Sequence, residues 1–186
     1  FCSTNQWNFD RAKTELRDLD ALRETKRCLY RPFDYRFTLF NRNICTIIRK
    51  RITHQFDKKN IGLLATRRIT RLPFNNIFVT NHYTEYKVAS HDRNTIVFPL
   101  WIISDQNSSG NFVLIKDQQR LNINLLFIEK IINNLNLNQD KNKLSMLKGI
   151  EPESIFNYIY AVFHSPTYRT RYAEFLKIDF PRLPLT

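Results

Sequence analysis

Hydrophobic positions in the first part of the chain follow two different periods and predict a helix followed by a strand. Three leucines recur at helical spacing within residues 10–29, so we expect a helix there with Asp10 as its N-cap. Pro32 should end that helix, because the residue before a proline avoids the α region. Residues 33–40 are rich in aromatic side chains and predict a strand.

A second helical pattern covers residues 44–56. Four isoleucines form one apolar stripe, while Arg49, Lys50 and Arg51 fall mostly on the other faces. We therefore expect a basic amphipathic helix that buries one stripe and offers the other faces to solvent or to phosphate.

Short apolar runs separated by polar turns come next and predict strands, because they are short and rich in β-branched residues. They cover residues 61–66, 76–80, 86–89 and 95–103. The loops between them are residues 67–75, 81–85 and 90–94, and residues 106–110 predict a turn or linker.

The last third of the chain has helical patterns. Residues 125–135 place their isoleucines and leucines on one face, and Pro152 fits the first position of a further helix. Ser165 and Pro166 repeat this start signal for a final helix that runs to about Lys177.

These elements predict an α+β fold: a mainly antiparallel β-sheet flanked by helices and followed by a C-terminal helical layer. Within it we distinguish three parts. They are a helical connection over residues 1–29, a β-rich part over residues 30–120 and a helical part over residues 121–186.

Charge changes this picture because it is concentrated in one segment. The 186 residues carry a net charge of +12, and eleven Lys or Arg against three acids lie between Arg42 and Arg93. Such a segment attracts polyanions, since binding phosphates releases condensed counterions. A solvated basic surface without a partner is the alternative.

Other bulk features narrow the class of protein. The three cysteines have no C-x-x-C spacing, which argues against a disulfide framework or a zinc site and fits a reducing cytoplasm. No apolar run has the length of a membrane span. The chain begins in mid-pattern without an initiator Met, so we expect a piece of a longer protein.

The basic segment, its loops above all, and Arg36 before it hold the side chains best suited to nucleic-acid contact. Arginine forks match guanine edges and phosphate oxygens, and Asn can bind the adenine edge through two hydrogen bonds. Solvated loops and ordinary turn residues are the alternatives for these positions, and an ion pair with Asp34 is the alternative for Arg36. The candidate contacts are Arg36, Arg49, Lys50, Arg67, Arg68, Arg71, Asn75, Asn76, Asn81, His82, Lys87 and Arg93.

Catalytic motifs are sparse. Glu85 and Lys87 have the Glu-x-Lys spacing of some metal-dependent nucleases, with Asp57 upstream, but this tripeptide is common by chance. The four histidines are scattered, which argues against a metal site. We expect His164 to cap or pack in the C-terminal helical hairpin and Ser165 to cap a helix. Without a Gly-rich methyl-donor loop or a phosphate loop, the chain should perform neither methyl transfer nor ATP hydrolysis.

Two stretches resemble a known family. One reads Tyr-Arg-Pro-Phe-Asp-Tyr-Arg over residues 30–36, and the other reads IFNYIYAVFHSPTYRTRYAEFLKIDFPRLPL over residues 155–185. With shorter markers such as Phe98-Pro99-Leu100 between them, they resemble the C-terminal target-recognition region of Type ISP restriction–modification enzymes and related adenine methyltransferase fusions, from about Tyr30 to Leu185.

The resemblance implies a non-catalytic module that recognises double-stranded DNA for the rest of its polypeptide. The upstream domains would then be a nuclease, an ATP-driven translocase and an adenine-N6 methyltransferase, which use Mg, ATP and S-adenosylmethionine. A scaffold that docks on those domains through exposed Tyr160, Tyr168 and Tyr172 is the alternative function.

Overall fold

The computed structural model describes residues 7–18, 20, 24–45, 48–70, 73–103, 115–116, 119–134 and 150–184. Its helices are α1 (Phe9–Asp18), α3 (Lys50–Thr53), α4 (Leu125–Asn134), α5 (Pro152–His164), α6 (Pro166–Arg171) and α7 (Ala173–Ile178), and a 3-10 turn, η1, spans His54–Phe56. Its strands are β1 (Thr25–Arg31), β2 (Asp34–Leu39), β3 (Gly62–Thr66), β4 (Ile77–Thr80), β5 (Tyr83–Thr84), β6 (Thr95–Pro99), β7 (Trp101–Ile103), β8 (Ile115–Lys116) and β9 (Gln119–Leu121).

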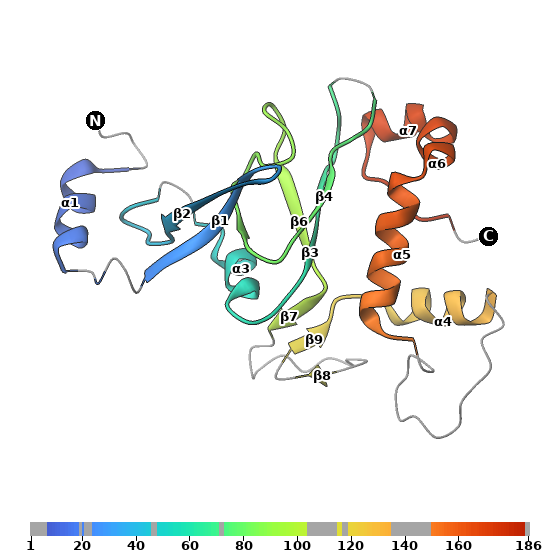
Figure 1. Ribbon diagram of the computed structural model, residues 1–186, viewed down its shortest axis with the longest axis horizontal. Coiled ribbons are helices and arrows are strands. Elements are labelled where there is room, and N and C mark those ends of the chain that lie inside the picture. The colour runs from blue at the N-terminus through green and yellow to red at the C-terminus, as the bar shows by residue number, and fades with distance from the viewer. Residues whose placement is uncertain are drawn as a thin grey trace.

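The strands form three three-stranded sheets, ordered β2-β1-β5, β4-β3-β6 and β7-β9-β8. Every strand pair in the described residues is antiparallel except β1 with β5. In Figure 1 the β1–β2 hairpin and α1 lie on one side of the sheet β4-β3-β6, and α5 stands on its other side. The expected α+β fold with helices at the C-terminus is confirmed, but its sheet is divided into three.

The expected strand over residues 95–103 breaks at Leu100, where the chain passes from one sheet to the next. The Asn60 side chain holds this junction: its Oδ1 accepts from the Trp101 N–H at 3.1 Å and its Nδ2 donates to the Trp101 carbonyl at 2.7 Å. The same Nδ2 donates to the Gln55 carbonyl at 2.8 Å, and Oδ1 accepts from the Ile61 N–H at 2.8 Å. A buried amide with all these partners fixes the switch between sheets.

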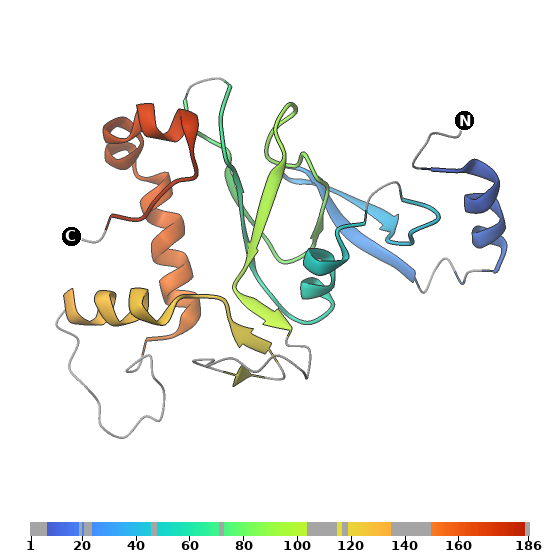
Figure 2. The ribbon, with the colours of Figure 1, turned by 180° about the vertical axis from the view of Figure 1, so that it is seen from behind.

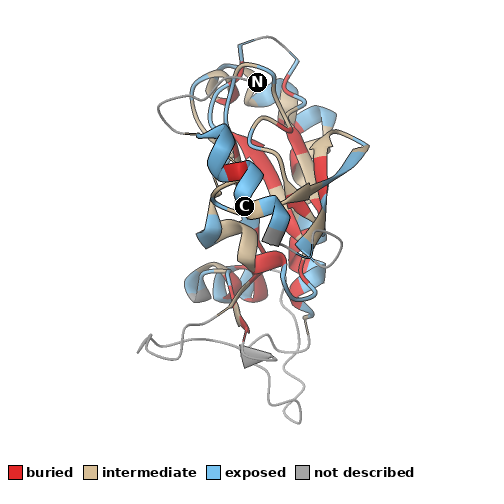
Figure 3. Cartoon of the chain, turned by 90° about the vertical axis from the view of Figure 1, so that its left-hand side faces the viewer, coloured by how far each residue is buried: buried red, intermediate tan, exposed pale blue. Residues whose placement is uncertain are grey.

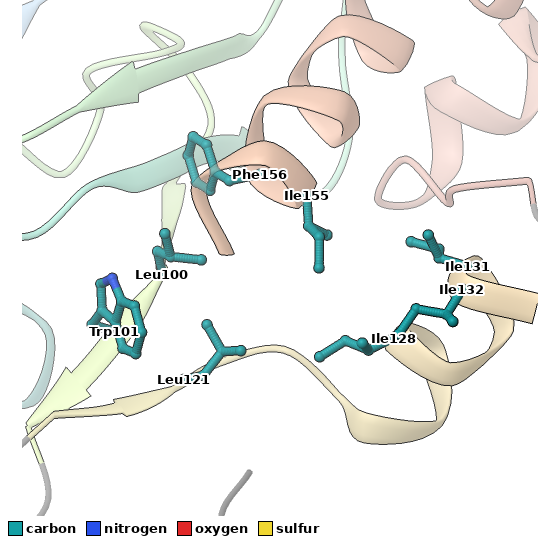
Figure 4. Packing of buried hydrophobic residues seen from close by; sticks show 8 residues of the cluster. All are labelled: Leu100, Trp101, Leu121, Ile128, Ile131, Ile132, Ile155 and Phe156. Carbon is teal, nitrogen blue, oxygen red and sulfur yellow. The ribbon is translucent and has the colours of Figure 1, made fainter. Parts of the chain in front are cut away.

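Three clusters of buried hydrophobic residues connect the sheets to the helices. Figure 4 shows the first, in which Leu100 and Leu121 of the β7–β9 region point toward α5 and α4, with Trp101 beside them on β7. In the second, Ala65 and Ile77 of the central sheet pack with side chains of α5, α6 and α7. The third joins β1, η1, β3 and β6, and the burial colours of Figure 3 show these buried positions running through the sheets.

Helices α5 and α6 begin where the sequence predicts. Pro152 occupies the first turn of α5, and the Ser165 hydroxyl accepts from the Tyr168 N–H at the start of α6. The expected single helix to Lys177 is interrupted at Tyr172, so that α6 and α7 are separate helices, as Figure 2 shows from behind.

The expectations for the first 60 residues need two corrections. The helix predicted over residues 10–29 ends at Asp18 in the described residues, and residues 25–31 form β1, because pairing with β2 along the hairpin outweighs the local helical period. The helix predicted over residues 44–56 is reduced to α3 and η1. The Ile44 carbonyl accepts from the Trp7 indole at 2.9 Å instead of continuing a helix.

Two further segments differ from the prediction. Residues 86–89, expected as a strand, form turns closed by the Val88 N–H on the Glu85 carbonyl and the Ser90 N–H on the Lys87 carbonyl. The expected loop 81–85 contains the short strand β5, and the predicted turn 106–110 lies outside the described residues.

Candidate nucleic-acid interface

Three segments meet at one end of the central sheet: the tip of the β1–β2 hairpin, the loop from β3 to β4 and the loop before β6. Strand pairing brings them together, since Ala65 pairs with Ile77 and Thr66 with Thr95 at that end. They lie toward the top of Figure 1. Between them is a cleft of about 390 Å³, called the loop cleft below. It is lined by Arg31, Pro32, Ile69, Thr70, Pro73, Asn75, Asn76, Lys87, Val88, Ala89, Ser90, His91 and Asp92.

An ion pair fixes the hairpin to one wall of the loop cleft. Arg31 Nη1 lies 2.6 Å from Glu85 Oε2, and the guanidinium carbon lies 4.1 Å from the centre of the Tyr30 ring. The same Glu85 oxygen accepts from the Lys87 N–H at 2.7 Å. Arg31 therefore holds the turn after β5 in place.

These contacts engage the Glu85 carboxylate, on which a nuclease built on Glu85 and Lys87 would depend. Glu85 is engaged by Arg31, and the Asp57 carboxylate accepts a hydrogen bond from the Tyr83 hydroxyl. In the part of the chain that the structure describes, no three His, Cys, Asp or Glu residues are grouped to hold a metal ion. Glu85 has a structural role in this arrangement.

Asp92 connects the two loops that face each other across the loop cleft. It accepts from the Thr70 hydroxyl at 2.6 Å and from the Ser90 hydroxyl at 2.7 Å. These two hydrogen bonds, Thr70 first, lower the pKa of Asp92 to about 2. Arg93 is one of the predicted contacts, and its Nε lies 3.7 Å from Asp92 Oδ2. The loops are therefore held as one unit at neutral pH.

The side chains that could read bases lie in or beside the loop cleft. Asn75 is exposed, Asn76 and Lys87 are half-buried, and all three line it. Arg68 is exposed on the loop after β3 and makes no hydrogen bond or ion pair with the described residues. Amides can bind the adenine edge, while Lys and Arg can bind guanine acceptors or phosphates.

Arg67 has a different position from Arg68. Its Nε lies 3.2 Å from Asp179 Oδ1, and Arg182 Nη2 lies 3.2 Å from the other oxygen of that carboxylate. The backbone N–H of Phe180, followed by Arg67 and Arg182, lowers the pKa of Asp179. Arg67 thus ties the loop after β3 to the segment that follows α7.

Two predicted contacts lie behind the hairpin and not in the loop cleft. Arg36 pairs with Asp34 at 3.0 Å and lies 3.8 Å from the Tyr30 ring centre, which matches the ion pair considered for it. Arg49 lies 4.4 Å from the Tyr86 ring centre. Both line a second, largely apolar cavity of about 520 Å³ between the hairpin, α3 and β6.

The remaining predicted contacts are dispersed. Lys50 is exposed at the start of α3. Asn81 and His82 follow the far end of β4, separated from Asn76 by the length of that strand. The His82 ring lies edge-on to Tyr35 with centroids 5.4 Å apart, and partial burial together with Arg27 lowers the pKa of His82. Arg71 lies outside the described residues.

Comparison with known proteins decides which class of protein has this arrangement. The sequence matches the family described as the Type ISP C-terminal specificity domain over residues 3–186. The chain belongs to this family. The match begins well before Tyr30, where the resemblance was expected to start.

Two solved structures share the fold of this specificity domain. One is the cryoEM structure of a DrdV–DNA complex, with 22% identity and a TM-score of 0.67 over 88% of this chain and 14% of that chain. The other is a nuclease-deletion mutant of the Type ISP restriction–modification enzyme LlaGI in complex with a DNA substrate mimic. It gives 21% identity and a TM-score of 0.56 over 87% of this chain and 12% of that chain. The chain thus spans less than a sixth of either protein, and no curated protein matches it.

Sequence reasoning missed the residues that hold the specificity domain's loops in place. Ser90 and Asp92 have the spacing of a local side-chain turn, but the bond from Thr70 spans 22 positions and has no local signal. His164 was expected to cap or pack in the C-terminal helical hairpin. It lies 4.3 Å from the Tyr160 ring, accepts from Arg169 at 3.0 Å through Nδ1 and donates to the Ile77 carbonyl from Nε2 at 3.3 Å.

The surface expected for a docking scaffold is only partly exposed in the specificity domain. Tyr168 is 6% exposed and its hydroxyl donates to the Arg182 carbonyl at 2.8 Å, while Tyr160 and Tyr172 pack against the same buried cluster.

Among the helices of the described ranges, none combines the length and apolarity needed to cross a bilayer.

Proposed function

We propose that this chain recognises a specific sequence in double-stranded DNA on behalf of a restriction–modification enzyme. The loop cleft carries this proposal, because it brings Asn75, Asn76 and Lys87 together on loops held by Asp92. Membership of the Type ISP specificity-domain family supports it, as do the DNA complexes of the two proteins with the same fold.

Recognition would divide between base edges and backbone. Asn75, Asn76 and Lys87 reach bases from the loop cleft, and Arg68 beside them contacts a base or a phosphate. Exposed cations outside the cleft, such as Lys50 and Lys59, add phosphate contacts that fix the register without reading sequence.

In this function the chain supplies no chemistry of its own. Binding would position an adenine for N6 methylation by another domain that uses S-adenosylmethionine. ATP-driven translocation and Mg-dependent cleavage would likewise belong to other domains, in a cytoplasmic enzyme. The burial of Tyr168 supports DNA recognition over the docking scaffold, for which Tyr168 was one of the expected contact residues; Tyr160 and Tyr172 are half-buried.

Selection from a randomised duplex pool, followed by binding over a salt series, tests the proposal. We expect an enriched motif and a steep fall in affinity as salt rises. Asn76→Ala should cost about 1–3 kcal/mol on that motif and relax the preference at one base position. Lys50→Ala should weaken binding to all duplexes alike and reduce the salt slope by about 1.

Lys130→Ala, on the exposed face of α4 far from the loop cleft, is the control and should leave the affinity unchanged. Salt-sensitive binding without any enriched motif would refute sequence recognition by this chain. It would leave a basic platform that depends on another domain for specificity.

A further inference from the structure

Phe33, at the tip of the β1–β2 hairpin, combines two unfavourable features. Its side chain is 90% exposed, and its φ of 65° makes it the one non-glycine residue of the described ranges in the left-handed region. With Pro32 before it, Phe33 stands at a turn position where Gly or Asn is the usual residue. A bulky side chain that keeps such an unfavourable backbone conformation is a candidate functional residue.

The hairpin presents this ring on a rigid support. Pro32 fixes its own backbone torsion, and Arg31 before it is held by Glu85 at 2.6 Å. After the turn, Asp34 is held by Arg36 at 3.0 Å, and the guanidinium groups of Arg31 and Arg36 both lie over the Tyr30 ring. Both ends of the turn are therefore fixed, and the exposed ring projects from it.

The tip adjoins the loop cleft. Arg31 and Pro32 line the cleft together with Asn76 and Lys87, so the residue after Pro32 lies beside the proposed base-reading side chains. The hairpin from Thr25 to Leu39 carries four Lys or Arg against one Asp, which favours a polyanion such as DNA over a neutral protein surface.

The opposite end of the hairpin is occupied by the rest of the chain. Glu15 of α1 accepts hydrogen bonds from Asn41 and Asn43 just beyond β2, at the end of the hairpin that α1 adjoins in Figure 1. Seven residues of β1 separate that end from the tip, roughly 23 Å at 3.3 Å per residue. The base of the hairpin is thus covered by α1, whereas the tip is left free for a partner.

We propose that Phe33 is a wedge that inserts its ring between two neighbouring base pairs at the edge of the bound DNA site. This inference rests on the proposed DNA recognition. Apolar side chains that enter base steps partly unstack and kink the duplex, which lets more of the protein surface contact it. The strained turn keeps the ring extended before DNA arrives, so no ordering of the tip is needed on binding.

Fluorescence of 2-aminopurine, which is quenched when the base is stacked, tests this wedge. The probe replaces one base at a time in a duplex that carries the motif selected by this 186-residue chain. We expect a rise in fluorescence at one step, next to the bases whose recognition Asn76→Ala relaxes. Phe33→Ala should abolish that rise and weaken binding roughly tenfold while the selected motif stays the same.

Two further variants separate the wedge from effects on folding. Phe33→Gly suits the left-handed backbone, so it should fold at least as well as the wild type and still lose the fluorescence rise. Phe37→Ala removes a phenylalanine that is 74% exposed on β2 of the same hairpin and should keep the rise.

The outcomes are distinguishable. If wild type and Phe33→Gly bind the motif with the same fluorescence, the wedge is refuted while DNA recognition stands, and the ring is then a contact for another protein. If Phe37→Ala abolishes the rise as completely as Phe33→Gly, the assignment to the tip is refuted. If no motif is selected, both proposals fail.

Discussion

At the scale of single residues, the candidate site depends on a few polar side chains that hold others in place. Asp92 joins the two loops, Glu85 holds Arg31, and Asp179 holds Arg67. None of these acids could contact DNA phosphates favourably, yet each positions a neighbouring cation or loop. Replacing such a residue should therefore change binding through the shape of the loop cleft.

The lowered pKa of Asp92 gives a test at this scale. Its ionised form is favoured by folding, so its contribution to stability is complete above the ordinary Asp pKa near 3.8 and is lost as the pH falls toward 2. Asp92→Asn should lower the melting temperature at pH 7, and the difference from wild type should shrink across that acidic range. Melting curves followed by circular dichroism from pH 7 to pH 2 measure it.

Thr70→Val and Thr70→Ser form a matched pair for this prediction. Thr70→Val removes the principal hydroxyl donor to Asp92 and should narrow the pH dependence, whereas Thr70→Ser should preserve it. A constant difference between Asp92→Asn and wild type at every pH would contradict the role assigned to the carboxylate.

At the scale of elements, predictions succeeded where local chemistry decides the structure. Pro152 and Ser165 start helices by capping and fixed backbone torsions, and β3 and β4 are recognisable from their β-branched and apolar residues. They failed where distant partners decide. Strand β1 has a helical period in its sequence context but pairs with β2. The helix expected from residue 44 begins as α3 only at Lys50, and the Ile44 carbonyl bonds to Trp7.

The same distinction explains how much of the candidate site the sequence revealed. Asn75, Asn76 and Lys87 were found from residue type and from their place in or next to the predicted loops, which are local properties. The partner of Arg67 is 112 positions away and could not be inferred from local pattern. Arg36 and Arg49 were chosen for their charge, but stacking on tyrosines places them behind the hairpin.

The junction between β6 and β7 gives a test at the scale of elements. Asn60→Ala leaves both backbone groups of Trp101 without their buried partners, so it should destabilise the fold by about 2–4 kcal/mol in urea unfolding. Asn122→Ala, which removes a single bond to the Pro99 carbonyl at 2.8 Å, should cost only about 1 kcal/mol. Equal losses would mean that Asn60 does not hold the junction.

At the scale of the whole molecule, the C-terminal helices share their hydrophobic cluster with the central sheet. Leu176 of α7 and Phe163 of α5 are buried together with Ala65 and Ile77. Removing residues 150–186 would therefore expose the face of the sheet that carries the reading loops. Such a truncation therefore cannot separate an assembly role from DNA binding.

Single substitutions test this shared core more cleanly. Leu176→Ala, at a fully buried position, should lower the unfolding free energy by about 2–5 kcal/mol and keep one cooperative transition. Leu126→Ala, at a position that is 66% exposed on α4, should stay within about 0.5 kcal/mol of wild type. Urea unfolding followed by both tryptophan fluorescence and circular dichroism measures this, and two separate transitions would show independent units.

The register of the central sheet has a consequence for retargeting. Thr66 pairs with Thr95, and Ala65 with Ile77, so the frame around the loops is set by strand pairing and not by loop length. Doubling the length of a flexible loop costs only roughly 0.6 kcal/mol in closure entropy, so one scaffold can carry loops suited to different targets. The bond from Thr70 to Asp92 makes the two loops a single cassette, and a chimaera with new specificity would have to exchange them together.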